Sequence, residues 1–402
     1  MEGFKGVKFV KEQLLFTPGP VNLAPNVRSA IGKTDICHRE VEFEILLKSI
    51  EAKILKLFQL EQKSGYRAVV ITGSGTAANE AILSSVVGDQ HILVISNGEF
   101  GERLHAISTI YNKNTQLLEF PCCEELDLAR IEAYLESHPI DVVAMVHHET
   151  SSGMLNSLEN VGAISKANGA MFIVDCVSSV GAEVINLKKC DIAYCSSSSS
   201  KALASPAGLS FVIGKTPEFE KLKDFPAKTT YLNLATFYHF LKTRSQTPNT
   251  PATSLFFALE QSLIDILEEG TLKRFETLRN KANALRRWML RLGLRFLIDQ
   301  KNMCSILTTV HLPSHIDMAT FRQKLREKAI IIYGGKGCFK NRVFQVGNIG
   351  ELSLGDIQFF LKTLSSVLGD FKETRPTSAF APRLDPILNR INMGVATSGD
   401  SV

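Results

Sequence analysis

The sequence predicts an α/β protein in which a large domain built on a mostly parallel sheet is followed by a smaller α+β domain. Two observations lead to this fold class. Short apolar runs alternate with longer helical segments as far as about residue 250, and the pattern changes beyond that point. Strands that helices cover on both faces appear as continuous apolar runs. The runs lie at residues 68–71, 92–95, 142–146, 172–174, 192–195 and 209–213.

The helices of the large domain follow from the spacing of apolar residues. Residues 43–60 (FEILLKSIEAKILKLFQL) keep apolar side chains at helical spacing and contain neither Gly nor Pro, which is typical of an amphipathic helix. Residues 76–87 and 158–168 are expected to form helices that connect parallel strands.

The C-terminal part indicates a second domain and a tail. Residues 253–292 predict long helices broken near Gly270, and the segment up to residue 368 predicts short strands and two helices. We expect an N-terminal arm and the large domain in residues 1–250, and linking helices with the small domain in residues 251–371. Residues 372–402 carry prolines and little periodicity, so we expect a tail lying loosely on the surface.

Composition excludes several classes of protein. The 402 residues include 45 Lys and Arg against 41 Asp and Glu, a net charge of +4, so no nucleic-acid partner is expected. No apolar run approaches the roughly 18 residues of a membrane helix, and the N-terminus lacks the apolar core of a signal peptide. The eight cysteines form no CxxC pair, which argues against a metal site. We therefore expect a cytoplasmic protein with free thiols and no membrane partner.

Residues 72–76 (TGSGT) follow the first apolar run and open a helix. Glycines permit a tight turn there, and the N–H groups of the first helical turn, together with the Ser and Thr hydroxyls, can bind an anion. An ordinary strand-to-helix turn has the same appearance, so this motif alone does not decide between the two.

Two charged residues stand at the ends of other strands. Asp175 directly follows the run 172–174, where a carboxylate can hold a protonated nitrogen, although a helix N-cap is an equal alternative. Lys201 follows five serines and has no acidic neighbour in the local sequence. A partly buried lysine of this kind can form a Schiff base, whereas most lysines are simply solvated.

Together, the anion site, the acid and the lysine match the phosphate, the pyridine nitrogen and the aldehyde of pyridoxal 5'-phosphate (PLP). The chain resembles the fold-type I, class V PLP-dependent aminotransferases, especially 2-aminoethylphosphonate–pyruvate transaminases and alanine–glyoxylate aminotransferases. The resemblance spans about residues 14–368. Its motifs are LLFTPGPV (14–21), GYRAVVITGSGTAANEA (65–81), ISNGEFGER (95–103), AMVHHETSSGMLN (144–156), IVDCVSSVGA (173–182), SSSSKALASPAGLSFV (197–212) and VGNIGE (346–351).

The resemblance implies a role for each matching residue. Lys201 would bond covalently to PLP, and Asp175 would pair with the pyridine nitrogen. The remaining cofactor residues would be Phe100, stacked on the ring; Ser74, Gly75 and Thr76, on the phosphate; Thr150, or Ser151 beside it, on the ring hydroxyl; and Ser200, next to the lysine. Asn249 and Thr250 would reach the phosphate of a partner chain, so a homodimer with shared active sites is expected.

The chain also departs from the resembling family at the substrate site. Gln345 stands where the phosphonate transaminases carry an arginine that binds the substrate anion, and glutamine offers no charged fork to such a group. Arg342, three residues before Gln345, could supply the missing charge, and Lys336 is also near Gln345 in the sequence. His38 and Arg39 resemble an element that binds substrate phosphate in phosphoserine aminotransferases, although Arg39 could instead form a salt bridge at a helix start.

These residues indicate an aminotransferase acting on a small amine that bears a phosphonate or carboxylate, with a 2-oxo acid as acceptor. Gln345 predicts weak exchange between 2-aminoethylphosphonate and pyruvate. A PLP-dependent lyase, decarboxylase or condensing enzyme is the alternative, because such a reaction need not accept pyruvate. A binding protein without cofactor is disfavoured, since Lys201 and Asp175 are both present.

Overall fold

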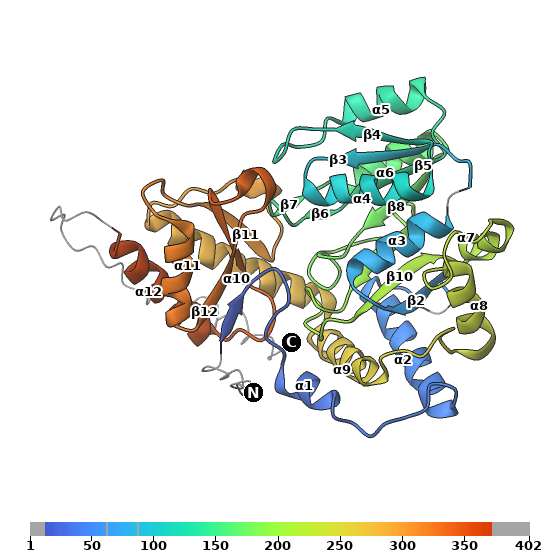
Figure 1. The fold of residues 1–402 in the computed structure, drawn as a ribbon, viewed down its shortest axis with the longest axis horizontal. Coiled ribbons are helices and arrows are strands. Elements are labelled where there is room, and N and C mark those ends of the chain that lie inside the picture. The colour runs from blue at the N-terminus through green and yellow to red at the C-terminus, as the bar shows by residue number, and fades with distance from the viewer. Residues whose placement is uncertain (1–12, 62, 87, 372–402) are drawn as a thin grey trace, which may run out of the picture.

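The computed structural model describes residues 13–61, 63–86 and 88–371, which form two lobes (Figure 1). The expected C-terminal tail, residues 372–402, lies outside the described residues. The large lobe holds the strands and helices from α2 to α8, the first strand β1 belongs to the small lobe, and α9 and α10 lead into the small lobe.

A seven-stranded sheet forms the centre of the large lobe, in the order β2-β10-β9-β8-β5-β3-β4. Strand β10 runs antiparallel to both of its neighbours, and the other pairs are parallel. The strands are β2 (Tyr66–Thr72), β3 (Ile92–Ser96), β4 (Thr115–Glu119), β5 (Val142–Val146), β8 (Met171–Asp175), β9 (Ile192–Ser198) and β10 (Leu209–Lys215). Each of the six apolar runs is a strand, as predicted.

Strand β4 was not expected, and its burial explains why. It is an edge strand that pairs only with β3 in this sheet, and most of its side chains are half-buried. A half-exposed edge strand carries polar residues, so TQLLE does not stand out as an apolar run.

Helices alternate with the strands along the chain and pack against one another. Helices α3 and α4 pack against each other, as do α5 and α6, and α2 packs along α9. In this last pair, the ring of Phe43 on α2 contacts the ring of Phe256 on α9, with 5.2 Å between the ring centroids. The helices are α1 (Pro25–Ala30), α2 (Val41–Leu57), α3 (Gly75–Ser85), α4 (Glu99–Tyr111), α5 (Leu128–Ser137), α6 (Leu158–Ala167), α7 (Thr216–Lys221), α8 (Leu234–Arg244), α9 (Thr253–Glu269) and α10 (Thr271–Arg291).

The small lobe contains a four-stranded sheet in the order β1-β12-β13-β11. Its first strand, β1 (Leu14–Phe16), comes from the N-terminal arm and runs parallel to β12, with Leu14 opposite Ile330. Phe16 stacks on Phe360 of the last helix at 4.3 Å between ring centroids. The other elements of the small lobe are β11 (Leu307–His311), α11 (Met318–Glu327), β12 (Ile330–Gly334), β13 (Val343–Gly347) and α12 (Leu354–Gly369). A two-stranded hairpin of β6 (His148–Glu149) and β7 (Met154–Leu155) belongs to the large lobe.

The topology places the chemistry at one edge of the large sheet. The carboxyl ends of its parallel strands meet there, and β2, β8 and β9 end close to the predicted anion site, acid and lysine. Within the described part of the chain, no helix is long and apolar enough to cross a membrane. All eight cysteines are free.

Candidate active site

Lys201 lies in the turn that follows β9. Its side chain is largely buried, and this burial, together with the charges of Lys336 and Arg103, lowers the pKa of the amine. The carboxylate of Asp175 opposes the shift but does not cancel it. A lowered pKa leaves more of the amine unprotonated at neutral pH, which is the form that acts as a nucleophile or a base.

The loop that follows β1 forms a wall beside Lys201. Gly19 has a φ of +131°, and a Cβ atom there would lie 2.6 Å from Lys201 Cδ and 2.9 Å from the carbonyl oxygen of Ser200. Only glycine accommodates both the backbone conformation and this approach. The hydroxyl of Tyr333, at the end of β12, donates to the carbonyl oxygen of Gly19 at 3.3 Å. The wall therefore connects Lys201 to the small lobe.

Asp175 ends β8 with a buried, hydrogen-bonded carboxylate. Oδ1 accepts from the backbone N–H of Val177 at 2.8 Å, and Oδ2 accepts from Asn79 Nδ2 at 2.6 Å. Asn79 lies on α3 and accepts in turn from the Ser196 hydroxyl at 2.5 Å. Burial raises the pKa of Asp175, and the two hydrogen bonds and the charge of Lys201 oppose that rise. The carboxylate is thus fixed in orientation by two neighbouring elements.

The predicted anion site lies at the N-terminus of α3. Ser74 is the N-cap residue, and its hydroxyl makes no capping hydrogen bond. A Cβ atom on Gly75 would lie 2.7 Å from the side chain of Val177 and 3.3 Å from Ser198. Glycine is therefore required where α3 approaches the segments after β8 and β9. The N–H groups of the first turn, Thr76 included, lack partners inside an α-helix and suit an anion.

Glu149 joins two segments of the site. Its Oε2 accepts from the backbone N–H groups of Phe100 and Gly101, at 3.1 Å and 3.2 Å, at the start of α4. Its Oε1 accepts from the N–H and the hydroxyl of Ser151, at 3.1 Å and 2.5 Å. The start of α4, which positions the ring of Phe100, is therefore tied to the Thr150–Ser151 segment by one buried side chain. Burial raises the pKa of Glu149, against these hydrogen bonds.

Thr150 belongs to a buried polar cluster. Its hydroxyl donates to Ser178 Oγ at 2.7 Å and to the carbonyl oxygen of His148 at 3.3 Å. Burial lowers the pKa of His148 to about 4 and that of His147 to about 3. Both imidazoles are therefore neutral near pH 7. Among the described residues, nothing hydrogen-bonds Nε2 of His148, which is fully buried.

Gln345 lies on β13 with its side chain directed at the large lobe. Its Nε2 donates to the carbonyl oxygens of Thr150 and Ser151, at 2.7 Å and 3.0 Å. The residue is only 6% exposed. Its amide N–H groups thus hold the backbone of the Thr150–Ser151 segment, whereas Arg342, just before the same strand, is exposed to solvent.

The hydrogen bonds that the Arg39 guanidinium donates all go to the segment after α8, and the guanidinium also lies 5.4 Å from the ring centroid of Phe240 on α8. Its guanidinium donates to the carbonyl oxygens of Thr247 and Pro248, at 2.6 Å and 2.8 Å, and to Gln246 Oε1 at 3.2 Å. None of these acceptors is a carboxylate, so Arg39 forms no salt bridge at the start of α2. The segment continues into Asn249 and Thr250, which are exposed. Arg39 therefore braces the segment that was expected to reach a partner chain.

His38 lies in the same turn as Arg39 and is half-buried. Burial and the neighbouring guanidinium lower the pKa of His38. The hydrogen bonds of Arg39 tie this turn to residues 246–248 and not to Lys201 or Asp175. Gln345, in contrast, contacts the Thr150–Ser151 segment, and the charge of Lys336 acts on Lys201.

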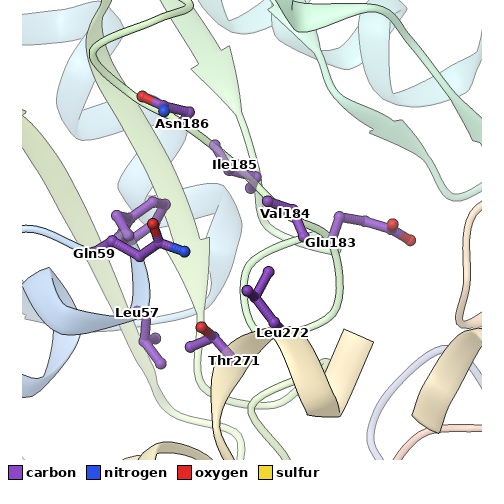
Figure 2. A pocket seen from close by; sticks show the side chains of 9 residues that line it. Leu57, Gln59, Glu183, Val184, Ile185, Asn186, Thr271 and Leu272 are labelled. Atoms are coloured by element: carbon purple, nitrogen blue, oxygen red, sulfur yellow. The ribbon is translucent and has the colours of Figure 1, made fainter. Parts of the chain in front are cut away.

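A separate cavity lies beside α2 and α10 (Figure 2). It has a volume of about 60 Å³ and is lined by Leu57, Glu183, Asn186, Leu272 and neighbouring residues, none of which is a predicted site residue. Small-molecule sites usually measure roughly 300–1,000 Å³, so this cavity is too small for PLP.

The residues around Lys201 fit PLP on three counts. The buried carboxylate of Asp175 forms no ion pair with any described cation within 4.0 Å, and a protonated pyridine nitrogen would supply one. The hydroxyl of Ser74 and the first N–H groups of α3 are available to a phosphate. The amine of Lys201 makes no hydrogen bond to another described residue, which leaves it available to an aldehyde.

This topology, with a buried lysine, a carboxylate and an anion site at neighbouring strand ends, defines a PLP-dependent transferase of fold type I. The family model described as "Aminotransferase class-V" matches residues 26–354, so the chain belongs to the class V aminotransferases. The resemblance, the fold class, the enzyme class and the PLP dependence predicted from the sequence are confirmed.

Three relatives show the extent of the similarity. The chain is 31% identical over 364 residues to a 2-aminoethylphosphonate–pyruvate transaminase of Vibrio vulnificus, covering 89% of this chain and 98% of that protein. It is 31% identical over 344 residues to an uncharacterized aminotransferase of Methanocaldococcus jannaschii, covering 84% and 88%. The crystal structure of an alanine–glyoxylate aminotransferase from Nostoc sp. superposes with a TM-score of 0.85 at 27% identity, covering 91% and 97%.

Sequence reasoning missed the residues that orient the predicted ones. Asn79 donates a hydrogen bond to Asp175, and Glu149 accepts one from the start of α4. Ser178 accepts a hydrogen bond from the hydroxyl of Thr150. Asn79 lies four residues after Gly75, on the same face of α3, and it interrupts an apolar stretch. That interruption was the signal that could have identified it.

Proposed function

We propose that this aminotransferase exchanges an amino group between a small amine carrying a phosphonate or carboxylate and a 2-oxo acid. The observation that carries the proposal is the convergence of Lys201, Asp175 and the N-terminus of α3 at one sheet edge. The 31% identity to 2-aminoethylphosphonate–pyruvate transaminases supports an acid-bearing amine as donor.

Lys201 would carry out the proton transfers. When bound, PLP withdraws electrons from the bonds at the substrate's Cα. The amine of Lys201, whose pKa is lowered by burial, would then take the proton from Cα and return it to the cofactor's C4′ as the amino group passes from the donor to the cofactor. Because Lys201 is largely buried, little water can reach the reacting atoms, and water therefore does not donate protons to them in place of Lys201.

Asp175 would hold a proton on the pyridine nitrogen. Its two hydrogen bonds, from Val177 N–H and Asn79, fix both oxygens, so the carboxylate needs no reorganisation when that nitrogen approaches. Ser74, Gly75 and Thr76 would bind the phosphate, Phe100 would lie on the ring, and Thr150 or Ser151 would bind the ring hydroxyl. Ser200 would line the pocket beside Lys201.

The working unit we propose is a cytoplasmic homodimer in which Asn249 and Thr250 complete the phosphate site of the partner. Both residues are exposed, and α2 exposes two large apolar side chains, with Val41 57% and Ile45 61% exposed. A mixing experiment tests this. Lys201→Ala and Asn249→Ala/Thr250→Ala, each inactive alone, should regain activity when refolded together, because one mixed site is then intact. No recovery in proven heterodimers would contradict shared sites.

A single-turnover experiment tests the reaction. The holoenzyme is mixed with 2-aminoethylphosphonate, β-alanine or other small acid-bearing amines without an acceptor, and the absorbance of the cofactor is followed. A transaminase transfers the amino group and leaves the pyridoxamine form, which a 2-oxo acid reverses. If donors instead release a carbonyl product, CO₂ or a condensed product while the original absorbance returns, the enzyme is a lyase, decarboxylase or condensing enzyme.

A further inference from the structure

An acid-bearing substrate needs a cation in the site, and two predicted candidates are already engaged. Gln345 is uncharged, and its amide nitrogen is occupied by the carbonyl oxygens of Thr150 and Ser151. The guanidinium of Arg39 is occupied by three acceptors after α8. An anchor for the acid group of the substrate must therefore come from other cations near Lys201.

Two cations lower the pKa of the Lys201 amine, and they come from opposite lobes. Arg103 on α4 lies with its guanidinium carbon 4.7 Å from the ring centroid of Phe100, so it stands beside the proposed ring-stacking residue. Lys336 lies in the loop between β12 and β13. Among the described residues, neither side chain has an ion-pair partner within 4.0 Å. Lys336 is exposed, and its reach is not limited by packing on an aromatic ring.

The backbone around Lys336 brings its loop to the site. The loop begins after Gly334, and the hydroxyl of the preceding residue, Tyr333, donates to the carbonyl oxygen of Gly19, which packs on Lys201. Tyr333 is also the cross-strand partner of Gln345. The N–H of Gly335 donates to the carbonyl oxygen of Val343 at 2.8 Å and closes the loop at its base. The loop is thus anchored on both sides, with Lys336 as its first residue beyond the closure.

We propose that Lys336 binds the acid group of the amine donor, and that it favours a tetrahedral oxyanion such as a phosphonate over a carboxylate. An ammonium is a compact point charge that suits a phosphate-like group, whereas a planar carboxylate is held best by the two parallel N–H donors of arginine. This inference rests on the proposed function. The acceptor's carboxylate then lacks an arginine, so the donor half of the reaction is faster than the exchange with pyruvate.

The test compares two donors of equal chain length, 2-aminoethylphosphonate and β-alanine, in the single-turnover reaction. Wild type should prefer the phosphonate. Lys336→Gln should lower kcat/KM for the phosphonate about 10-fold or more, since a hydrogen bond to a charged group is worth that much. Lys336→Arg should keep activity and shift preference toward β-alanine. Lys340→Gln, in the same loop, is the matched control and should behave as wild type.

A binding measurement separates recognition from chemistry. Calorimetric titration of the holoenzyme with ethylphosphonate, which has no amine to react, should give a Kd raised about 10-fold in Lys336→Gln and unchanged in Lys340→Gln. Should Lys336→Gln match wild type in both assays, the proposal is wrong, and loss in Arg103→Gln alone would transfer the role to that residue. If wild type itself shows no amino transfer with any donor, the proposed function fails instead.

Discussion

The two sides of the active site differ in how firmly they are built. On the large lobe, Asp175, Glu149 and Thr150 are buried and each is tied by two or more hydrogen bonds. On the small lobe, Lys336 and Arg342 are exposed and have no described ion-pair partner. The comparison indicates that the large-lobe side is fixed in advance, whereas the exposed cations of the small lobe can change with few consequences for the fold.

Loss of Lys201 is the largest effect expected on the fixed side. Lys201→Ala should abolish the covalent link to PLP that borohydride reduces, and should lower turnover at least about 100-fold, the contribution of a positioned general base. Mass spectrometry of the reduced protein measures the link. Cofactor still attached to another lysine would show that Lys201 has been misassigned.

Removal of Asn79 tests whether the orientation of Asp175 matters. Asn79→Ala removes a donor to a buried carboxylate and should lower kcat about 10-fold or more, because such bonds to charged groups are worth about 1.5–3 kcal/mol. Ser196→Ala is the control, since it removes only the partner on the far side of Asn79. It should have the smaller effect on kcat. Equal losses would mean that the effect is one of packing rather than of orientation.

Gln345→Arg tests the buried position on the small lobe. An arginine at this position restores a bidentate donor for a carboxylate, so kcat/KM for pyruvate as acceptor should rise about 10-fold. Thermal unfolding serves as the check, since the new side chain must replace two hydrogen bonds to the cofactor segment. A stable variant with unchanged pyruvate use would place the acceptor's carboxylate elsewhere.

The smallest effect concerns stability at mildly acid pH. His148 is held neutral in the fold, with its pKa lowered to about 4, and an unfolded histidine titrates near 6.5. The unfolded state therefore binds the extra proton first, and stability falls as the pH drops below 6.5. Between pH 7.5 and 5.5 the loss is about 1 kcal/mol for this residue. His148→Asn should lose less stability over this range in urea titrations, and an unchanged slope would contradict the assignment.

Local motifs account for what the sequence predicted of the site. Asp175 ends an apolar strand, Lys201 lies shortly after another, and the predicted anion site is the five-residue motif TGSGT. Each of these site predictions therefore depends on a short local segment. The partners that orient them depend on long-range packing. Gln345 contacts Thr150, which is 195 residues away in the chain, and Arg39 contacts Thr247, which is 208 residues away. No local pattern indicates such pairs.

The fold was predictable for the same reason, except at two of its edge strands. Buried strands are recognisable because both faces are apolar, but β4 and β1 are edge strands with half-buried residues. For β1, the sequence also did not indicate which strand it pairs with. Its three residues are too few to specify a partner, and the packing of Phe16 on Phe360 helps to hold it beside β12.

The pairing of β1 with β12 has a consequence for the synthesis of the chain. Leu14 leaves the ribosome early, yet its partner Ile330 is made more than 300 residues later. At roughly 5–20 residues per second, the arm would wait tens of seconds for its place in the small sheet. The wall beside Lys201, which Gly19 forms just after β1, can be completed only then. An incomplete chain would therefore hold the catalytic lysine in an open site, and assembly of the active site becomes a late event in folding.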